Sequence, residues 1–102
     1  MDSRIINKDN QLKQTIDLLL KKYNKKILIK DFWEADRCAI GLSDTSENYL
    51  IYISTYSLLP GKYNIILEDM SDNKETPLII GEYSNISLDK FEEILKKYFK
   101  IK

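Results

Sequence analysis

Between Lys26 and Tyr83, apolar and polar residues alternate over several short stretches, and this pattern constrains the fold more than any other feature of the sequence. A period of two is typical of strands that bury one face, and β-branched and aromatic residues are frequent here. The predicted strands are Ile27 to Trp33, Cys38 to Ser43, Tyr49 to Tyr56, Tyr63 to Met70 and Pro77 to Tyr83. Because a parallel crossover needs about a dozen residues and these connections are short, we expect an antiparallel meander.

A helical period flanks this region at both ends of the chain. Near the start, apolar residues recur at helical spacing from Leu12 to Tyr23, which predicts a helix over about residues 10–23. Near the end, Ser87 is a suitable N-cap for a second helix, whose apolar stripe runs from Phe91 to Phe99. Each helix has one apolar face that another part of the protein must cover.

Together these elements predict a single α+β domain over residues 1–102. We expect a four- or five-stranded antiparallel meander sheet with the N-terminal and C-terminal helices packed on one face. The length of 102 residues supports one domain and no second one. The pattern leaves open whether the first predicted strand joins the main sheet.

The chain contains no His, one Cys and three Gly, and these counts exclude most catalytic and cofactor-binding motifs. The absence of His excludes Ser-His-Asp and Cys-His catalysis as well as zinc sites that use two histidines. A single cysteine, Cys38, cannot build a thiolate metal site. The glycines Gly41, Gly61 and Gly81 are too far apart to form a phosphate-binding loop. We therefore expect a protein that is not an enzyme and needs no cofactor or metal.

The net charge of zero hides an uneven distribution of charge along the chain. Residues 1–30 contain eight basic and three acidic residues, and residues 89–102 contain five basic and three acidic residues. Residues 31–88, which include the predicted strands, contain ten acidic and three basic residues. An acidic sheet segment would repel a phosphate backbone, so we expect no direct binding of nucleic acid. It would attract a basic protein partner.

The acidic and aromatic residues of the sheet segment are the candidate partner-binding residues. If the helices cover the face that carries Ile51 and Leu67, the opposite face presents tyrosines beside acidic residues. Tyrosine and tryptophan are enriched at binding hot spots. The aromatic candidates, which would anchor the partner by burying their side chains, are Trp33, Tyr52 and Tyr56. The acidic candidates, whose charge would complement a basic partner, are Asp31, Glu34, Asp36, Glu68, Asp72 and Glu75.

Each group of candidates also has a simpler interpretation. The carboxylates are more typical of a solvated surface than of a binding site, and the tyrosines would cover the solvent side of an antiparallel sheet. For Trp33, packing in the core is favoured over a place in an interface.

Signals for secretion or membrane insertion are missing from the sequence. The first residues lack a basic segment followed by an apolar one, as a secretory signal requires. The longest runs of aliphatic residues have three members, whereas a membrane-spanning helix needs about 20 apolar residues. We therefore expect a cytoplasmic protein that does not contact the membrane.

The layout resembles that of the small immunity proteins of bacterial polymorphic toxin systems, in particular those of contact-dependent growth inhibition. The resemblance is carried by the absence of His, the N-terminal amphipathic helix, the Tyr- and Ile-rich meander and the closing helix from Ile86 onward. It covers the whole chain in layout and rests on no diagnostic motif. It implies a protein that binds one cognate toxin domain, often a basic nuclease, and blocks it by stoichiometric occlusion without turnover.

One alternative from another functional class stays open. A small adaptor or secretion chaperone would hold a peptide segment at a sheet edge or in a helix groove. Dimerisation and binding of an unfolded segment would favour this alternative, and a one-to-one complex with a folded toxin would favour immunity. The sequence leaves the oligomeric state open.

Overall fold

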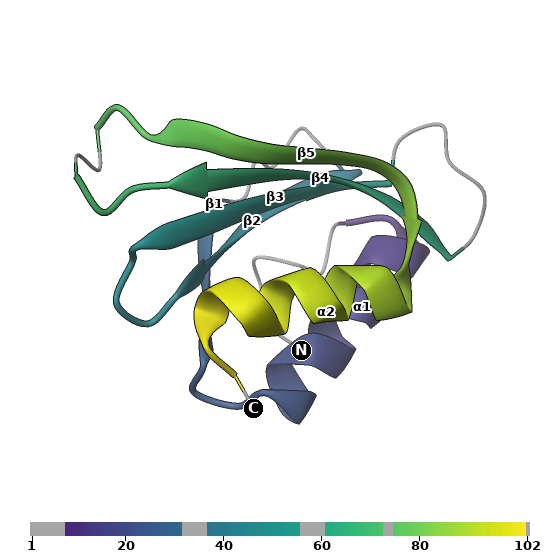
Figure 1. Cartoon of the computed structure of the whole chain (residues 1–102). Helices are drawn as coiled ribbons and strands as arrows, with labels where there is room; N and C mark the ends of the chain where they lie inside the picture. Colours follow the sequence, from purple (N-terminus) through teal and green to yellow (C-terminus); the bar gives the residue numbers. More distant parts are fainter. Residues whose placement is uncertain (1–7, 32–36, 56–60, 73–74, 102) are drawn as a thin grey trace.

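Five strands and two helices make up the structure, a computed structural model that describes residues 8–31, 37–55, 61–72 and 75–101 (Figure 1). In chain order, the elements are α1 (Asn10–Lys22), β1 (Ile27–Asp31), β2 (Ala39–Asp44), β3 (Tyr49–Ser54), β4 (Lys62–Asp69), β5 (Leu78–Ser87) and α2 (Leu88–Phe99).

The strands form one sheet in the order β1-β2-β3-β4-β5, and every neighbouring pair is antiparallel. Both helices lie on the same side of the sheet (Figure 1). The predicted α+β meander with two helices on one face is therefore confirmed. The question that the sequence left open is also answered, because β1 joins the sheet as one of its two edge strands.

The core lies between the sheet and the helices. On β4 every second residue is buried, as the alternating pattern predicts, whereas β2 and β3 also bury Ser43 and Leu50 on the other face of the sheet. The helices contribute the apolar stripes read from the sequence. The side chains with at most 1% exposure include Leu12, Ile16, Leu19, Ile40, Leu42, Ile51, Ile53, Ile65, Leu67, Phe91 and Leu95. The hydroxyl groups of Thr15 and Tyr63 are 2.6 Å apart inside this layer and connect α1 to β4.

Asp9 caps α1 and attaches its first turn to the sheet. Its carboxylate accepts hydrogen bonds from the backbone N–H of Leu12 at 2.8 Å and from the hydroxyl of Thr55 at 2.7 Å. Its own backbone N–H donates to the carbonyl of Arg37 at 2.7 Å. Partial burial disfavours the charged form, but these hydrogen bonds outweigh it and lower the pKa of Asp9. Asp9 thus holds the start of α1 against the end of β3.

The last strand is longer than the sequence pattern predicts. The pattern predicts an end at Tyr83, whereas β5 continues to Ser87 and leads directly into α2. The extension is possible because Asn85 takes a left-handed conformation, with φ 54°, and its N–H donates to the side chain of Asn64 at 2.9 Å. This local irregularity shifts the register, so that Ile86 still pairs with Tyr63. The predicted N-cap is confirmed, since the Ser87 hydroxyl accepts from the N–H of Lys90.

Candidate functional site

A first row of residues crosses the face of the sheet that points away from the helices. Tyr52 on β3 pairs with Ile66 on β4, and Ile66 pairs with Glu82 on β5. Directly opposite side chains of antiparallel strands have Cβ atoms about 5 Å apart, so these three are neighbours. Tyr52 also pairs with Gly41, which pairs with the backbone of Asp31 at the end of β1. The row therefore holds an aromatic and an apolar residue between two positions occupied by acidic residues.

A second, parallel row lies next to the first. It runs from Leu28 on β1 through Ser43 and Leu50 to Glu68 on β4 and Ile79 on β5. Leu28 is 42% exposed and Ile79 is 59% exposed, whereas Ser43 and Leu50 between them are buried, so apolar surface is available at the two ends of the row and not in its middle. Neither of the two helices in the described part of the chain covers this face (Figure 1). We call the two rows together the open face.

The β5 edge extends the apolar surface of the open face. Leu78, Ile79 and Ile80 are 61%, 59% and 45% exposed, and they follow one another at the start of this ten-residue strand. The opposite edge differs, because β1 has five residues, includes Lys30 and is irregular near Asp31. Short length, lysine and bulges are features that protect an edge strand from pairing with another chain. By these criteria β1 is protected, whereas β5 exposes apolar side chains on an edge that no other strand in the described part of the chain pairs with.

Four of the predicted partner-binding residues have described side chains. Tyr52 and Glu68 are half-buried and lie on the open face, on neighbouring strands. Asp72 and Glu75 are exposed in the connection between β4 and β5. The structure thus places these acidic residues at the end of the sheet where the apolar part of β5 begins.

The other predicted residues lie wholly or partly outside the described part of the chain. The backbone of Asp31 is at the end of β1, but its side chain is not described. Trp33, Glu34, Asp36 and Tyr56 fall within residues 32–36 and 56–60, which are outside the described residues.

Sequence reasoning missed the exposed apolar residues of β5. The alternating pattern predicts a strand from Pro77 to Tyr83, but the position of this strand in the sheet follows from the strand order. In a meander the first and last strands are always at the edges, so the run Leu78-Ile79-Ile80 could have been recognised as apolar surface on an edge.

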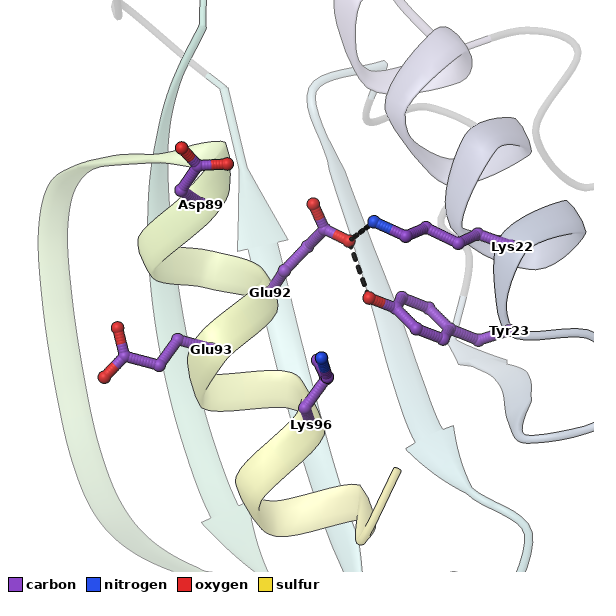
Figure 2. A pocket seen from close by; sticks show the side chains of 6 residues that line it. All are labelled: Lys22, Tyr23, Asp89, Glu92, Glu93 and Lys96. Atoms are coloured by element: carbon purple, nitrogen blue, oxygen red, sulfur yellow. Dashed lines mark hydrogen bonds and ion pairs between the residues drawn. The ribbon is translucent and has the colours of Figure 1, made fainter. Parts of the chain in front are cut away.

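A hollow of about 360 Å³ lies between the two helices on the other side of the molecule (Figure 2). Its central group is Glu92 on α2, whose Oε1 accepts hydrogen bonds from Lys22 Nζ at 2.8 Å and from the Tyr23 hydroxyl at 2.7 Å. The remaining lining residues are Asp89, Glu93 and Lys96. Burial opposes the charge of Glu92, but the bonds from Lys22 and Tyr23 outweigh it and lower its pKa. Burial in turn raises the pKa of Tyr23, and Glu92 adds to that effect.

This arrangement is typical of an ion pair that joins two helices. A carboxylate with a lowered pKa is ionised at neutral pH, and here both of its neighbours donate to it. It fixes the end of α1 to the middle of α2, and we assign it a structural role.

Replacing Glu92 by Gln tests this role through the pH dependence of stability. We expect Glu92→Gln to lower the free energy of unfolding by about 1 kcal/mol at neutral pH, because a charge-assisted hydrogen bond is lost. The pKa of Glu92 is lower in the folded state than the ordinary value of 4.5, so its contribution is present above that pH and is lost as the pH falls below it. The measurement is urea denaturation of both proteins across the acidic range.

The matched control is Glu93→Gln, because Glu93 is one residue away and its side chain is 71% exposed. We expect this control to change stability little at any pH. A difference between Glu92→Gln and wild type that stays constant down to pH values well below 4.5 would contradict the assignment.

Comparison of the chain with protein-family models, curated proteins and solved structures gives no significant match. Among residues 8–31, 37–55, 61–72 and 75–101, no group of three His, Cys, Asp or Glu side chains is placed to bind a metal ion. Neither described helix is long and apolar enough to cross a bilayer. The open face and the β5 edge therefore provide the main structural basis for a functional proposal.

Proposed function

We propose that the protein is an immunity protein that binds a cognate toxin domain and neutralises it by one-to-one occlusion. The observation that supports this proposal best is the exposed apolar run of the β5 edge, Leu78 to Ile80, which lies beside Ile66 of the open face and is bordered by carboxylates. A contiguous exposed apolar surface with a polar rim is typical of a protein-binding site.

Burial of the apolar residues of the β5 edge would supply part of the binding free energy of a complex. Leu78, Ile79 and Ile80 are each about half exposed, so about half of the burial energy of an aliphatic side chain remains to be gained. That is about 1 kcal/mol for each residue, or roughly a hundredfold in affinity for the three together. A tight inhibitor needs a larger binding free energy than these three residues supply. In this proposal Tyr52 is a central anchor of the interface, and Trp33 and Tyr56 are further anchors predicted from the sequence.

The charge of this region supports a basic partner. Glu68 and Glu82 lie on the open face, and Asp72 and Glu75 flank the start of β5. Asp69 at the end of β4 accepts two hydrogen bonds from Ser71, and these bonds lower its pKa and keep it ionised. Such a field accelerates association with a basic domain more than it strengthens the final complex. Toxin nucleases are commonly basic, which fits the resemblance to immunity proteins.

The test is protection against a toxin encoded beside this protein. The toxin domain is expressed in a sensitive host with and without this chain, and the purified proteins are then mixed and analysed by size-exclusion chromatography with light scattering. We expect restored growth and a one-to-one complex. A toxin domain that stays lethal and forms no complex would overturn the immunity proposal for that pair.

The exposed β5 edge also supports the second candidate, an adaptor or secretion chaperone that adds a peptide strand to its sheet. A ten-residue edge strand with apolar side chains is suitable for this mode of recognition. The same mixing experiment separates the candidates, since a chaperone binds an unfolded segment of its partner and an immunity protein binds the folded toxin domain.

A further inference from the structure

A second hollow, of about 670 Å³, lies where the C-terminal ends of α1 and α2 meet. It adjoins the hollow of Figure 2, with which it shares Lys22, Tyr23 and Lys96. Four lysines from three different parts of the chain line it, and no carboxylate is among the described residues of its lining. The full set of lining residues is Lys22, Tyr23, Asn24, Lys26, Lys96, Lys100 and Ile101. We call it the lysine hollow.

Lysines at helix C-termini are common because they balance the helix dipole. The net charge of the hollow therefore decides whether its lysines could also bind an anion. The ends of two helices carry about half a negative charge each, and Glu92 beside Lys22 adds one full negative charge. Against these roughly two negative charges stand the four lysines of the hollow. About two positive charges are therefore left over, which is more than the helix ends require.

The backbone at Lys100 allows this lysine to be replaced by glycine. Lys100 is the C-cap of α2 and has a left-handed conformation, with φ 56°. Glycine is the residue that adopts this conformation without strain, and an L-residue with a side chain is strained there. A lysine at this position places a charge on the rim of the hollow at the expense of local stability.

We propose that the lysine hollow binds a compact anion that carries two or more phosphate groups. Lysine ammonium groups bind phosphate oxygens as point charges, and each offers three donors. A compact ligand with several charges matches four ammonium groups around one hollow better than an extended acidic peptide, whose charges are spread along its length. The site is separate from the open face and does not depend on the proposed function.

The test uses inorganic tripolyphosphate as the probe, with binding measured by calorimetry and by NMR chemical-shift changes at low ionic strength. We expect saturable binding, with the largest shifts at the ends of α1 and α2. Lys100→Gly should weaken binding about fivefold, since one charge pair at about 5 Å in water is worth about that factor. The double variant Lys26→Gln with Lys100→Gly should weaken it about twentyfold or more.

Lys100→Gly also separates binding from folding, because glycine suits the left-handed C-cap. We expect this variant to be at least as stable as the wild type, so that weaker binding cannot be ascribed to unfolding. The matched control is Lys90→Gln, which removes the same charge near the opposite end of α2 and should leave binding within about twofold.

Three results would overturn the proposal: no saturable binding of tripolyphosphate, equal binding by Lys100→Gly and Lys90→Gln, or shifts confined to the open face. A single-stranded oligonucleotide is titrated in parallel. Tight binding of the oligonucleotide without binding of tripolyphosphate would show that the surface reads an extended nucleic-acid backbone, and this would also contradict a site for a compact phosphate ligand.

Discussion

Truncation of Phe91 to alanine is expected to lower the free energy of unfolding by about 3–5 kcal/mol. Phe91 has no exposed surface, and its ring lies 5.8 Å from the ring of Tyr63. Tyr63 in turn contacts Thr15 through its hydroxyl group, so the cavity would open where α1, α2 and β4 meet. A domain of 102 residues has a total stability of about 5–15 kcal/mol, so the variant would lose a large fraction of it.

The measurement is equilibrium denaturation by urea, with the midpoint and slope compared between variants. Lys97→Ala on the same helix is the control, because Lys97 is exposed and loses at most its contact with the ring of Tyr98, so its removal should change stability by no more than about 1 kcal/mol. A loss below about 1 kcal/mol for Phe91→Ala would show that α2 is not held to the sheet as the structure describes.

Reversal of two charges near the open face is expected to have the largest effect on partner association. We expect Glu68→Lys with Asp72→Lys to reduce the association rate with the toxin domain at least about tenfold at low salt, because the attractive field becomes repulsive. The difference should shrink as salt is added. Stopped-flow fluorescence at several ionic strengths measures both effects.

A suitable control changes the net charge of the protein by the same amount and leaves the residues of the open face unaltered. Asp17→Lys with Glu93→Lys serves this purpose, since both residues lie on the helices. Because Glu68 is half-buried, its replacement could also disturb folding, and the exposed residue Asp72 is therefore reversed alone as well. Equal association rates for the open-face variant and the helix control would contradict the acidic-face mechanism, even if a complex with the toxin domain still forms.

Much of the fold could be predicted from the sequence because its signals are local. The period-two stretches became strands, the helical stripes became α1 and α2, and Ser87 caps α2 as predicted. The length of β5 could not be predicted in this way. Its extension beyond Tyr83 depends on the left-handed backbone of Asn85 and on the side chain of Asn64, which is far away in sequence.

The candidate site was predicted in part. Alternation along β3 and β4 correctly separated Tyr52 and Ile66 from the buried Ile51 and Leu67, because side-chain direction along a strand follows from sequence alone. Alternation does not identify the exposed apolar residues of β5, because Leu78, Ile79 and Ile80 follow one another and are exposed through the position of β5 at the edge of the sheet. Trp33 stays a prediction, since it lies outside the described residues.

By itself, the sequence determined the period of each element, the antiparallel order imposed by short connections and the uneven distribution of charge, because these properties depend on residues that are near one another in the chain. Only the tertiary structure decided which charges act together. Lys22 and Lys100 are distant in sequence but line one hollow, and Glu92 neutralises part of that charge from the facing helix. Electrostatic interactions act through space, so a binding surface built from several elements emerges only when those elements are packed against each other.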